Sequence, residues 1–370
     1  SVRLWKKGDT LVQTDLAATF RMIRDAGREG FYAGWVADSI VAEMQAKGGL
    51  ITHADLAAYQ AKWRDVLHFD YDGYRIYSMP PPSSGGLLLA QFFGMLQPYP
   101  LKKYGFHSPQ AIHLMAEVER RAYADRAQYM ADPDFYHVPV RELTDSAYLR
   151  QRMSDYDAKK ASKSKAIKAG TIKESEETTH YCITDADGNA VSVTTTVNTN
   201  YGAKVVVKGA GFILNNEMDD FAAKPNSPNV FGLLGGDANA IAPNKRMLSS
   251  MTPTIVEKDG KLHLLVGTPG GATIPTSVFQ VLVNVLVFEQ PLLQAVHARR
   301  FHHQHSPDKI QHEKDAFSKS TIRTLRSWGH VVEERKSIGL VEAILIHPDG
   351  RQEGVADRRA NDTALGVSEK

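Results

Sequence analysis

Apolar residues recur at helical spacing in three stretches of the first 150 residues, namely 16–23, 35–44 and 112–130. Between the second and third stretches, residues 68–79 alternate aromatic and polar side chains around an Asp-Gly turn, which is typical of a β-hairpin. We therefore expect this part of the chain to be mostly helical, with one hairpin inserted between helices.

Several residues mark where these helices should begin and end. Gly48 is expected to end one helix, Thr52 to cap the next, and Ser108, which precedes a proline, to cap a third. The segment PPPSSGG, residues 80–86, has prolines that remove hydrogen-bond donors and glycines that permit close backbone approach. We interpret it as a structural turn that leads into a helix from Leu87, rather than as a binding loop.

The composition changes over residues 158–177, which hold six lysines but only two sizeable apolar side chains. This composition indicates an exposed, mobile linker, and its lysines a solvated surface, since no aromatic residues are interleaved for stacking on bases. The rest of the chain mixes strands with helices, which favours a layered body of both. The predicted strands lie within 178–198, 212–214, 254–257, 262–267 and 341–356, and the predicted helices are 276–288 and 318–328.

Charge and cysteine content narrow the classes of ligand. The 44 basic and 42 acidic side chains leave a formal charge of +2, too small for the field that binds nucleic acid or a membrane surface. The longest apolar run, 276–288, is shorter than the roughly 20 residues that span a bilayer. The single cysteine, Cys182, excludes cysteine-based zinc and iron–sulfur sites within one chain, and we interpret it as a buried, inert thiol. Small molecules remain the expected ligands.

Residues 179–198 predict a second hairpin, because the loop DADGN at 185–189 has strong turn chemistry. Pairing across this loop places Thr178 opposite Thr196, and Asn198 then shares the face of Thr196. Thr178 also lies where the linker meets the strand. If the chain were cut before it, the freed α-amine, with a pKa of about 7.7–8.0, could act as general base for the hydroxyl. From this spacing alone, the favoured interpretation remains that threonines simply suit a strand.

Three further polar motifs lie near predicted strands. Ser249-Ser250 precedes a strand, and the Gly270-Gly271 turn can present two backbone N–H groups to a developing oxyanion. The segment NNEMDD, residues 215–220, adds carboxylates that suit an ammonium group or a hard cation. Three neighbouring histidines are assigned a structural role rather than a metal site: His302, His303 and His305.

Taken together, these motifs resemble the γ-glutamyltranspeptidase family of N-terminal-nucleophile hydrolases. The resemblance covers nearly the whole chain. The matching motifs are PPPSSGG, YADR at 123–126, TTHY at 178–181, DADGNAVSVT at 185–194, LNNEMDDF at 214–221, GGDANA at 235–240, PNKRMLSSMTPT at 243–254, GTPGGA at 267–272 and RFHHQ at 300–304.

The resemblance implies an α+β fold with a four-layer αββα sandwich. It also implies a proenzyme that cuts itself at Glu177-Thr178, so that residues 1–177 form the last part of a large subunit and 178–370 a small subunit, which associate as a heterodimer. The chain starts at a point well inside the family's large subunit. We therefore expect it to lack the upstream arginine that pairs with the donor's carboxylate, with Arg120 or Arg121 the first alternatives to examine.

Roles in catalysis follow from the same resemblance. Thr178 would be both nucleophile and base, Thr196 would hydrogen-bond and activate it, and Gly270 and Gly271 would form the oxyanion hole. Phe231 lies where many relatives have a tyrosine in a lid loop, so a lid without its polar latch is expected.

Roles in donor binding are implied as well. Asn198, Glu217 and Asp220 would hold the α-ammonium group of a γ-glutamyl donor. Ser249 and Ser250 would hold its α-carboxylate, so that opposite charges or polar groups meet.

The implied reaction is transfer of a γ-glutamyl group from glutathione or related amides to water, an amino acid or a peptide. It needs no metal or organic cofactor and no nucleic-acid partner, and the family resemblance suggests a periplasmic or secreted location. Two alternatives stay open. One is a cephalosporin or glutaryl acylase of the same family, against which the ammonium-binding residues argue; the other is an unprocessed, non-catalytic truncated form.

Overall fold

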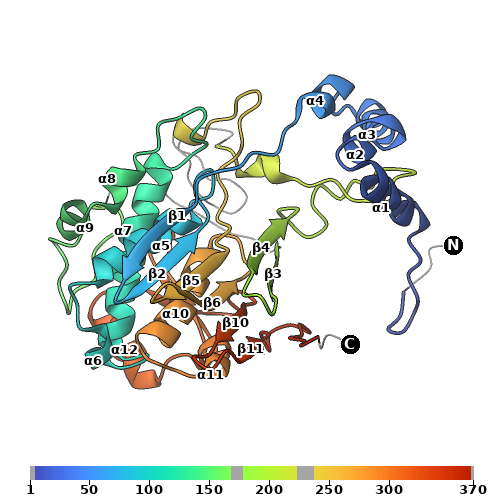
Figure 1. The fold of residues 1–370 in the computed structure, drawn as a ribbon. Helices are drawn as coiled ribbons and strands as arrows, with labels where there is room; N and C mark the ends of the chain where they lie inside the picture. Colours follow the sequence, from blue (N-terminus) through green and yellow to red (C-terminus); the bar gives the residue numbers. More distant parts are fainter. Residues whose placement is uncertain (1–4, 168–177, 223–236, 368–370) are drawn as a thin grey trace. The chain divides into compact units, whose positions relative to one another are not determined.

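The computed structural model describes residues 5–167, 178–222 and 237–367 (Figure 1). The chain divides into two compact units, of which the smaller comprises residues up to Trp63 together with 200–216, and the larger the remainder. Among the described residues, no helix is long and apolar enough to cross a membrane.

The smaller unit is helical. Its helices are α1 (Thr14–Ala26), α2 (Glu29–Tyr32), α3 (Gly34–Lys47) and α4 (His53–Ala58). The predicted boundaries are confirmed: α3 ends at Gly48, which adopts the left-handed φ of 72°, and Thr52 caps α4 in a capping box with Asp55. The predicted strand at 212–214 is wrong, because only Ile213 forms a β-bridge, to Val206.

The larger unit is built on a six-stranded antiparallel sheet. Its strands, in spatial order, are β1 (Leu67–Tyr71), β2 (Tyr74–Ser78), β5 (Thr254–Lys258), β6 (Lys261–Gly267), β10 (Glu342–Ile346) and β11 (Gln352–Val355). The first hairpin and the last are therefore both confirmed, at opposite edges of one sheet. A smaller sheet joins β7 (Phe301–His302), β8 (Ile310–Glu313) and β9 (Val332–Arg335).

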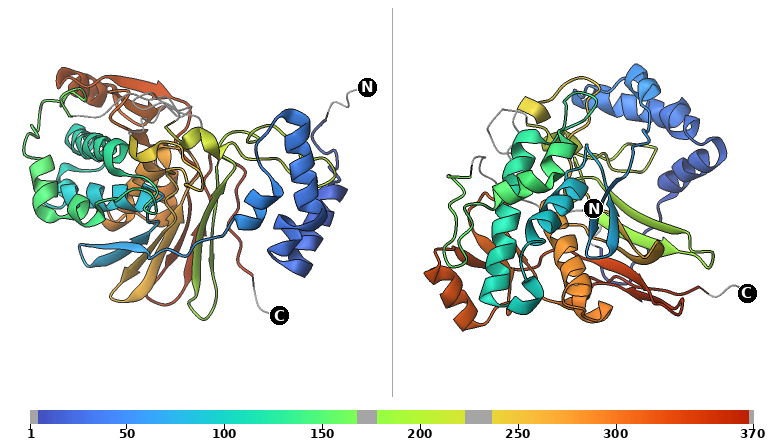
Figure 2. Two further views of the ribbon diagram at one scale, coloured as in Figure 1. Left: turned by 90° about the horizontal axis from the view of Figure 1, so that it is seen from above. Right: turned by 60° about the vertical axis from the view of Figure 1, so that its left-hand side comes forward.

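Helices α5 (Gly85–Leu96) and α10 (Thr273–Leu286) pack on one face of the six-stranded sheet, and α7 (Pro109–Tyr129) packs against α5 (Figure 2). Leu264 and Val266 of β6 join their apolar core. Ser108 caps α7 as predicted, through a hydrogen bond from the Ala111 N–H, and Pro109 follows it. The remaining helices of this unit are α6 (Leu101–Tyr104), α8 (Val140–Thr144), α9 (Ser146–Arg152), α11 (Leu292–His297) and α12 (Lys319–Ser327).

The hairpin of β3 (Thr178–Thr184) and β4 (Ala190–Thr196) packs on the other face of this sheet. Successive residues of a strand point to opposite faces of the sheet. Leu264 and Val266 point toward the helices, so Gly267, which follows Val266, lies on the opposite face. A Cβ atom added to Gly267 would lie 2.1 Å from the His180 ring, so only glycine lets the hairpin approach this closely. The layers thus run helices, sheet, hairpin. The α+β class is confirmed, and the described residues of this unit supply three of the four predicted layers.

The predicted linker is only partly an exposed segment. Ala161, Ser164 and Ile167 are buried, and the Ser164 hydroxyl accepts a hydrogen bond from Arg120 Nη1 at 2.5 Å. The prediction of an exposed linker is therefore wrong for Ala161, Ser164 and Ile167, whose small or apolar side chains are buried. The lysines between them, Lys159, Lys160, Lys163 and Lys165, are exposed as predicted. Residues 168–177 lie outside the described part of the chain.

The two structural units do not coincide with the two predicted subunits. The six-stranded sheet takes β1 and β2 from before Thr178 and its other four strands from after it. Cleavage at Glu177-Thr178 would therefore not separate two folding units. The predicted subunit boundary stays a prediction.

Candidate active site

The register predicted for the β3–β4 hairpin is confirmed. Thr178 pairs with Thr196, and the Thr178 hydroxyl donates to Thr196 Oγ1 at 3.2 Å. The backbone N–H of Asn198 also donates to Thr196 Oγ1, at 2.8 Å. The loop is closed by Asp185, which accepts from the Asn189 N–H. Turn chemistry at one end of the hairpin therefore brings the two threonine hydroxyls together at the other end.

A cavity of about 30 Å³ lies beside this threonine pair. Eight of the ten predicted site residues line it, although they come from separate segments of the chain. These eight are Thr178, Thr196, Asn198, Glu217, Asp220, Ser249, Ser250 and Gly271. Of the other two, Gly270 precedes Gly271 in the same turn, and Phe231 lies outside the described residues.

The Gly270-Gly271 turn connects β6 to α10. Gly270 has a φ of 135° and Gly271 a φ of 56°, which residues with side chains rarely adopt. The Gly270 carbonyl accepts from the N–H and the hydroxyl of Thr273, which fixes the turn. Neither glycine N–H donates a hydrogen bond to any residue that the structure describes. Both are thus available to an oxyanion at the mouth of this turn.

Two acidic residues of the cavity, Glu217 and Asp220, lie on one 3₁₀ turn and so share one face of it. The pKa of Asp220 is raised to about 8, mainly by burial and also by the charge of Glu217, while the charge of Arg126 opposes the increase. Burial likewise raises the pKa of Glu217 to about 7. Within the described residues, no group donates a hydrogen bond to the buried Asp220 Oδ1. This pair is therefore suited to a cationic ligand, which would favour the ionised carboxylates.

The predicted turn at residues 80–86 holds the serine pair in place. The N–H and the hydroxyl of Ser84 donate to the Ser249 carbonyl at 2.9 and 2.8 Å, and the Ser249 N–H donates to the Pro82 carbonyl at 3.1 Å. A Cβ atom on Gly85 would lie 2.4 Å from the Met251 carbonyl oxygen, which explains the glycine. The turn is structural, as predicted, but what it supports is the candidate site.

Arg126 of α7 also lines the cavity, although the sequence did not predict it as a site residue. Its Nη2 atom donates to Ser250 Oγ at 3.0 Å, and its side chain is buried. Arg120 and Arg121, the alternatives considered, both bind Glu117 instead and do not line the cavity. The sequence does distinguish these arginines. Arg120 and Arg121 follow Glu117 by three and four residues, so each can pair with it on one helix face. Arg126 has no acid at helical spacing, so its partners must come from other elements.

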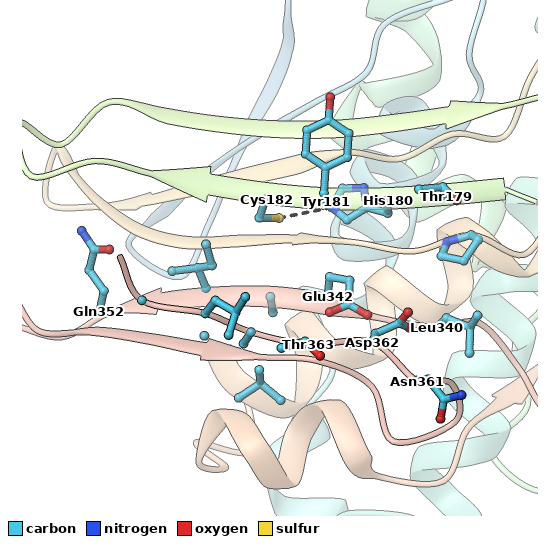
Figure 3. Close-up of a pocket in the computed structure, with 18 of the residues that line it drawn as sticks. Thr179, His180, Tyr181, Cys182, Leu340, Glu342, Gln352, Asn361, Asp362 and Thr363 are labelled. Carbon is cyan, nitrogen blue, oxygen red and sulfur yellow. Dashed lines mark hydrogen bonds between the residues drawn. The ribbon is translucent and has the colours of Figure 1, made fainter. Parts of the chain in front are cut away.

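A larger cavity, of about 610 Å³, extends along β3 from Thr178 to Cys182 (Figure 3). Thr178 is the one predicted site residue in its lining. Its wall includes Glu342, whose pKa burial raises to about 8. Cys182 is half-buried rather than buried, and desolvation raises its pKa to about 12, so the thiol is protonated and inert at neutral pH, as interpreted.

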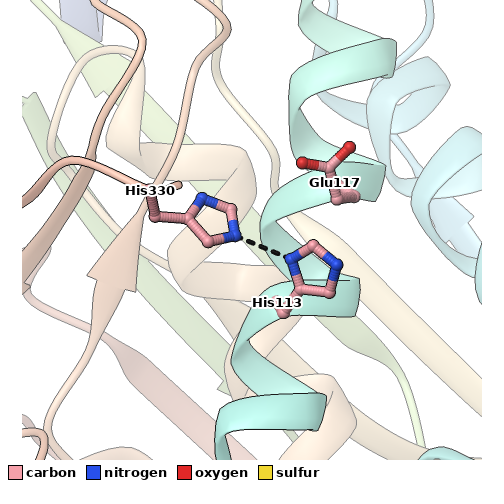
Figure 4. A group of neighbouring side chains, drawn as sticks. All are labelled: His113, Glu117 and His330. Carbon is pink, nitrogen blue, oxygen red and sulfur yellow. Dashed lines mark hydrogen bonds between the residues drawn. The ribbon is translucent and has the colours of Figure 1, made fainter. Parts of the chain in front are cut away.

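One cluster has the residue types of a metal site, His113, Glu117 and His330 (Figure 4). The histidines share a hydrogen bond of 2.7 Å between Nδ1 of His113 and Nε2 of His330. Glu117 accepts from both Arg120 and Arg121, whose charges would repel a metal cation. We therefore assign this cluster to packing. The three histidines predicted to be structural, His302, His303 and His305, are buried and hydrogen-bonded to protein groups.

Comparison with known proteins adds independent evidence. The structure is similar to the crystal structure of cephalosporin acylase from Bacillus halodurans, with a TM-score of 0.82 and 24% identity, covering 97% of this chain and 63% of that one. The two chains therefore share a fold. A sequence model described as Gamma-glutamyltranspeptidase matches residues 1–367. The chain belongs to the gamma-glutamyltranspeptidase family.

Two relatives represent the branches of that family. The chain is 49% identical over 359 residues to the glutathione hydrolase proenzyme of Escherichia coli strain K12, covering 96% of this chain and 62% of the relative. It is 37% identical over 362 residues to the acylase ACY 1 proenzyme of Pseudomonas sp. strain V22, covering 98% and 62% respectively. The chain thus spans about three-fifths of the length of these curated relatives.

Proposed function

We propose that this protein is an enzyme that transfers γ-glutamyl groups from glutathione and related amides to water, an amino acid or a peptide. One observation carries the proposal: a threonine hydroxyl, two half-buried acids and two serines converge on one cavity. A γ-glutamyl group presents to such a cavity a carbonyl, an ammonium and a carboxylate. Each of these groups has a complementary partner there.

In the proposed mechanism, the chain is first cut before Thr178, which frees its α-amine. The amine takes the hydroxyl proton while Oγ1 attacks the γ-carbonyl carbon, and the N–H groups of Gly270 and Gly271 stabilise the oxyanion. Collapse of the tetrahedral intermediate breaks the amide bond, and the proton passes to the leaving amine. Water or an acceptor amine then attacks the acyl-threonine ester and restores the hydroxyl. Thr196, 3.2 Å from Thr178 Oγ1, orients the nucleophile.

Donor recognition would separate the two charges of the glutamyl group. Asn198, Glu217 and Asp220 bind its ammonium, and Ser249 and Ser250 bind its carboxylate. The raised pKa values of the two acids support this assignment. Burial disfavours their ionised forms, and the positive charge of a bound ammonium would favour them.

Processing, partners and location complete the proposal. The names of the relatives identify them as proenzymes, and cleavage here at Glu177-Thr178 would leave a heterodimer of 1–177, with any preceding segment, and 178–370. Phe231 is proposed to belong to a lid. A periplasmic or secreted location follows from the family resemblance alone.

The alternative within the family is an acylase for glutaryl or cephalosporin side chains, as the name of one relative suggests. A glutaryl group has no ammonium and would leave the half-buried Asp220 without that partner. We therefore favour the glutamyl donor. In the test, the intact protein as its gene encodes it is given glutathione or glutaryl-p-nitroanilide, and free glutamate or nitroaniline is measured. Faster turnover of the glutaryl donor, or no turnover of either, would contradict the proposal.

The donor's KM is expected to depend on pH. The ammonium binds ionised carboxylates, and the pKa values of Glu217 and Asp220 are raised to about 7 and about 8. Raising the pH from 6 to 8.5 ionises both groups, so the KM for γ-glutamyl-p-nitroanilide should fall across this interval. Glutaryl-p-nitroanilide serves as the control, since its KM should not fall. A KM for the glutamyl donor that stays flat or rises would count against the assignment of the acids.

A further inference from the structure

We propose that Arg126 is a positioning residue that fixes the Ser250 hydroxyl as a hydrogen-bond donor to the carboxylate of the substrate. The inference rests on the proposed function and adds to it a residue that neither the motif roles nor the hairpin geometry assigned. It concerns how the carboxylate end of the cavity is built, from α7 on one side and the turn at residues 80–86 on the other.

The hydrogen bond between Arg126 and Ser250 has a fixed direction. A guanidinium group has five N–H donors and no acceptor, whereas a serine hydroxyl has one proton to donate and lone pairs that accept. In the contact between Arg126 Nη2 and Ser250 Oγ, 3.0 Å long, the serine must therefore accept. Its single proton is left to point elsewhere. A carboxylate in the cavity, which only accepts, is the matching partner for that proton.

The Arg126 guanidinium is itself held in place. Arg126 Nε donates to Ser84 Oγ at 2.9 Å, and the Ser84 hydroxyl donates its one proton to the Ser249 carbonyl at 2.8 Å. Every bond in this chain of contacts thus runs in one direction, from Arg126 through Ser84 to the backbone of the serine pair. The rigid fork of arginine makes both contacts at once, which the single ammonium of a lysine cannot do with the same geometry.

Arg126 is also a buried cation. The Arg126 side chain is 2% exposed, and a buried cation is retained at a cost in desolvation that ion pairing or hydrogen bonding must offset. Its charge lowers the pKa of Asp220, against the larger effect of burial, so the guanidinium lies close enough to influence both ends of the cavity. A cation at the serines and acids at the 3₁₀ turn complement a ligand that carries both charges.

The experiment compares two donors within each variant of the intact protein. γ-Glutamyl-p-nitroanilide has an ammonium and a carboxylate, whereas 4-aminobutyryl-p-nitroanilide keeps the ammonium and lacks the carboxylate. The quantity measured is the ratio of their kcat/KM values. Because both donors meet the same enzyme preparation, this ratio does not depend on the fraction of a variant that is folded or processed.

Arg126→Lys is expected to lower this ratio about tenfold, as for the loss of a hydrogen bond from a charged group. Ser84→Ala should lower it as well. Ser83→Ala is the matched control, since Ser83 Oγ donates to the Met251 carbonyl and does not contact the guanidinium. In a Ser250→Ala background, Arg126→Lys should have no further effect, because the hydroxyl through which it acts is gone.

Two results would overturn the inference. One is an unchanged ratio in Arg126→Lys, and the other is an undiminished effect of Arg126→Lys when Ser250 is already alanine, which would mean that the arginine does not act through this hydroxyl. Failure of the proposed function looks different, because the unmodified protein would then turn over neither donor.

Discussion

Thr178→Ala is expected to abolish both cleavage of the Glu177-Thr178 bond and turnover of glutathione. The substitution removes the hydroxyl that attacks in both reactions, and loss of a nucleophile costs on the order of 10⁴–10⁶ in rate in related catalytic systems. Intact-mass spectrometry under denaturing conditions should show one chain for this variant. The unmodified protein should yield a 193-residue fragment, residues 178–370.

Two further variants separate chemistry from folding. Thr178→Ser keeps a hydroxyl and should retain part of both reactions. Thr179→Ala changes the neighbouring threonine, which pairs with Thr195 and does not line the smaller cavity, and it should be cut and active. An uncut but fully active Thr178→Ala protein would end the assignment of this threonine as nucleophile.

Asp220→Ala should raise the KM for glutathione by about 10- to 150-fold, which corresponds to the roughly 1.5–3 kcal/mol of a hydrogen bond to a charged group. The carboxylate is expected to contact the donor's ammonium and to have no equivalent role toward a glutaryl donor. Steady-state kinetics with both donors measure the difference, and thermal unfolding monitors the fold.

Asp219→Ala is the matched control for this prediction. It removes the same charge from the same 3₁₀ turn, but Asp219 is exposed and does not line the cavity. Its effect on KM should therefore be small. Equal losses on glutamyl and glutaryl donors in Asp220→Ala would show that the carboxylate maintains the fold of the site rather than the ammonium contact.

The sequence predicted best what local rules determine. Strong turn residues at 185–189 and the two-residue period of strands were enough to pair Thr178 with Thr196. Helix caps such as Thr52 and Ser108 were likewise found from their immediate neighbours. In these cases the deciding contacts lie within a few residues, or within one hairpin, of each other.

What the sequence could not predict depends on which distant segments meet. The contact of Arg126 with Ser250 joins residues 124 positions apart, and nothing in the helical pattern around Arg126 specifies that partner. The composition of residues 158–167 suggested exposure because the lysines dominate it, yet Ser164 is buried against Arg120. Residues 212–214 have the side chains of a strand, but only Ile213 finds a bridging partner.

The interleaving of strands in the six-stranded sheet has a kinetic consequence for a protein cut at Glu177-Thr178. β2, from before the cut, pairs with β5, from after it, over five residue pairs. In an uncut chain these strands find one another at the effective concentration set by their covalent connection. Once the bond is broken, reassembly after complete unfolding requires two molecules to meet, so its rate depends on protein concentration. The β2–β5 pairing can hold the two fragments together after the cut, but the fragments can no longer refold as a single molecule.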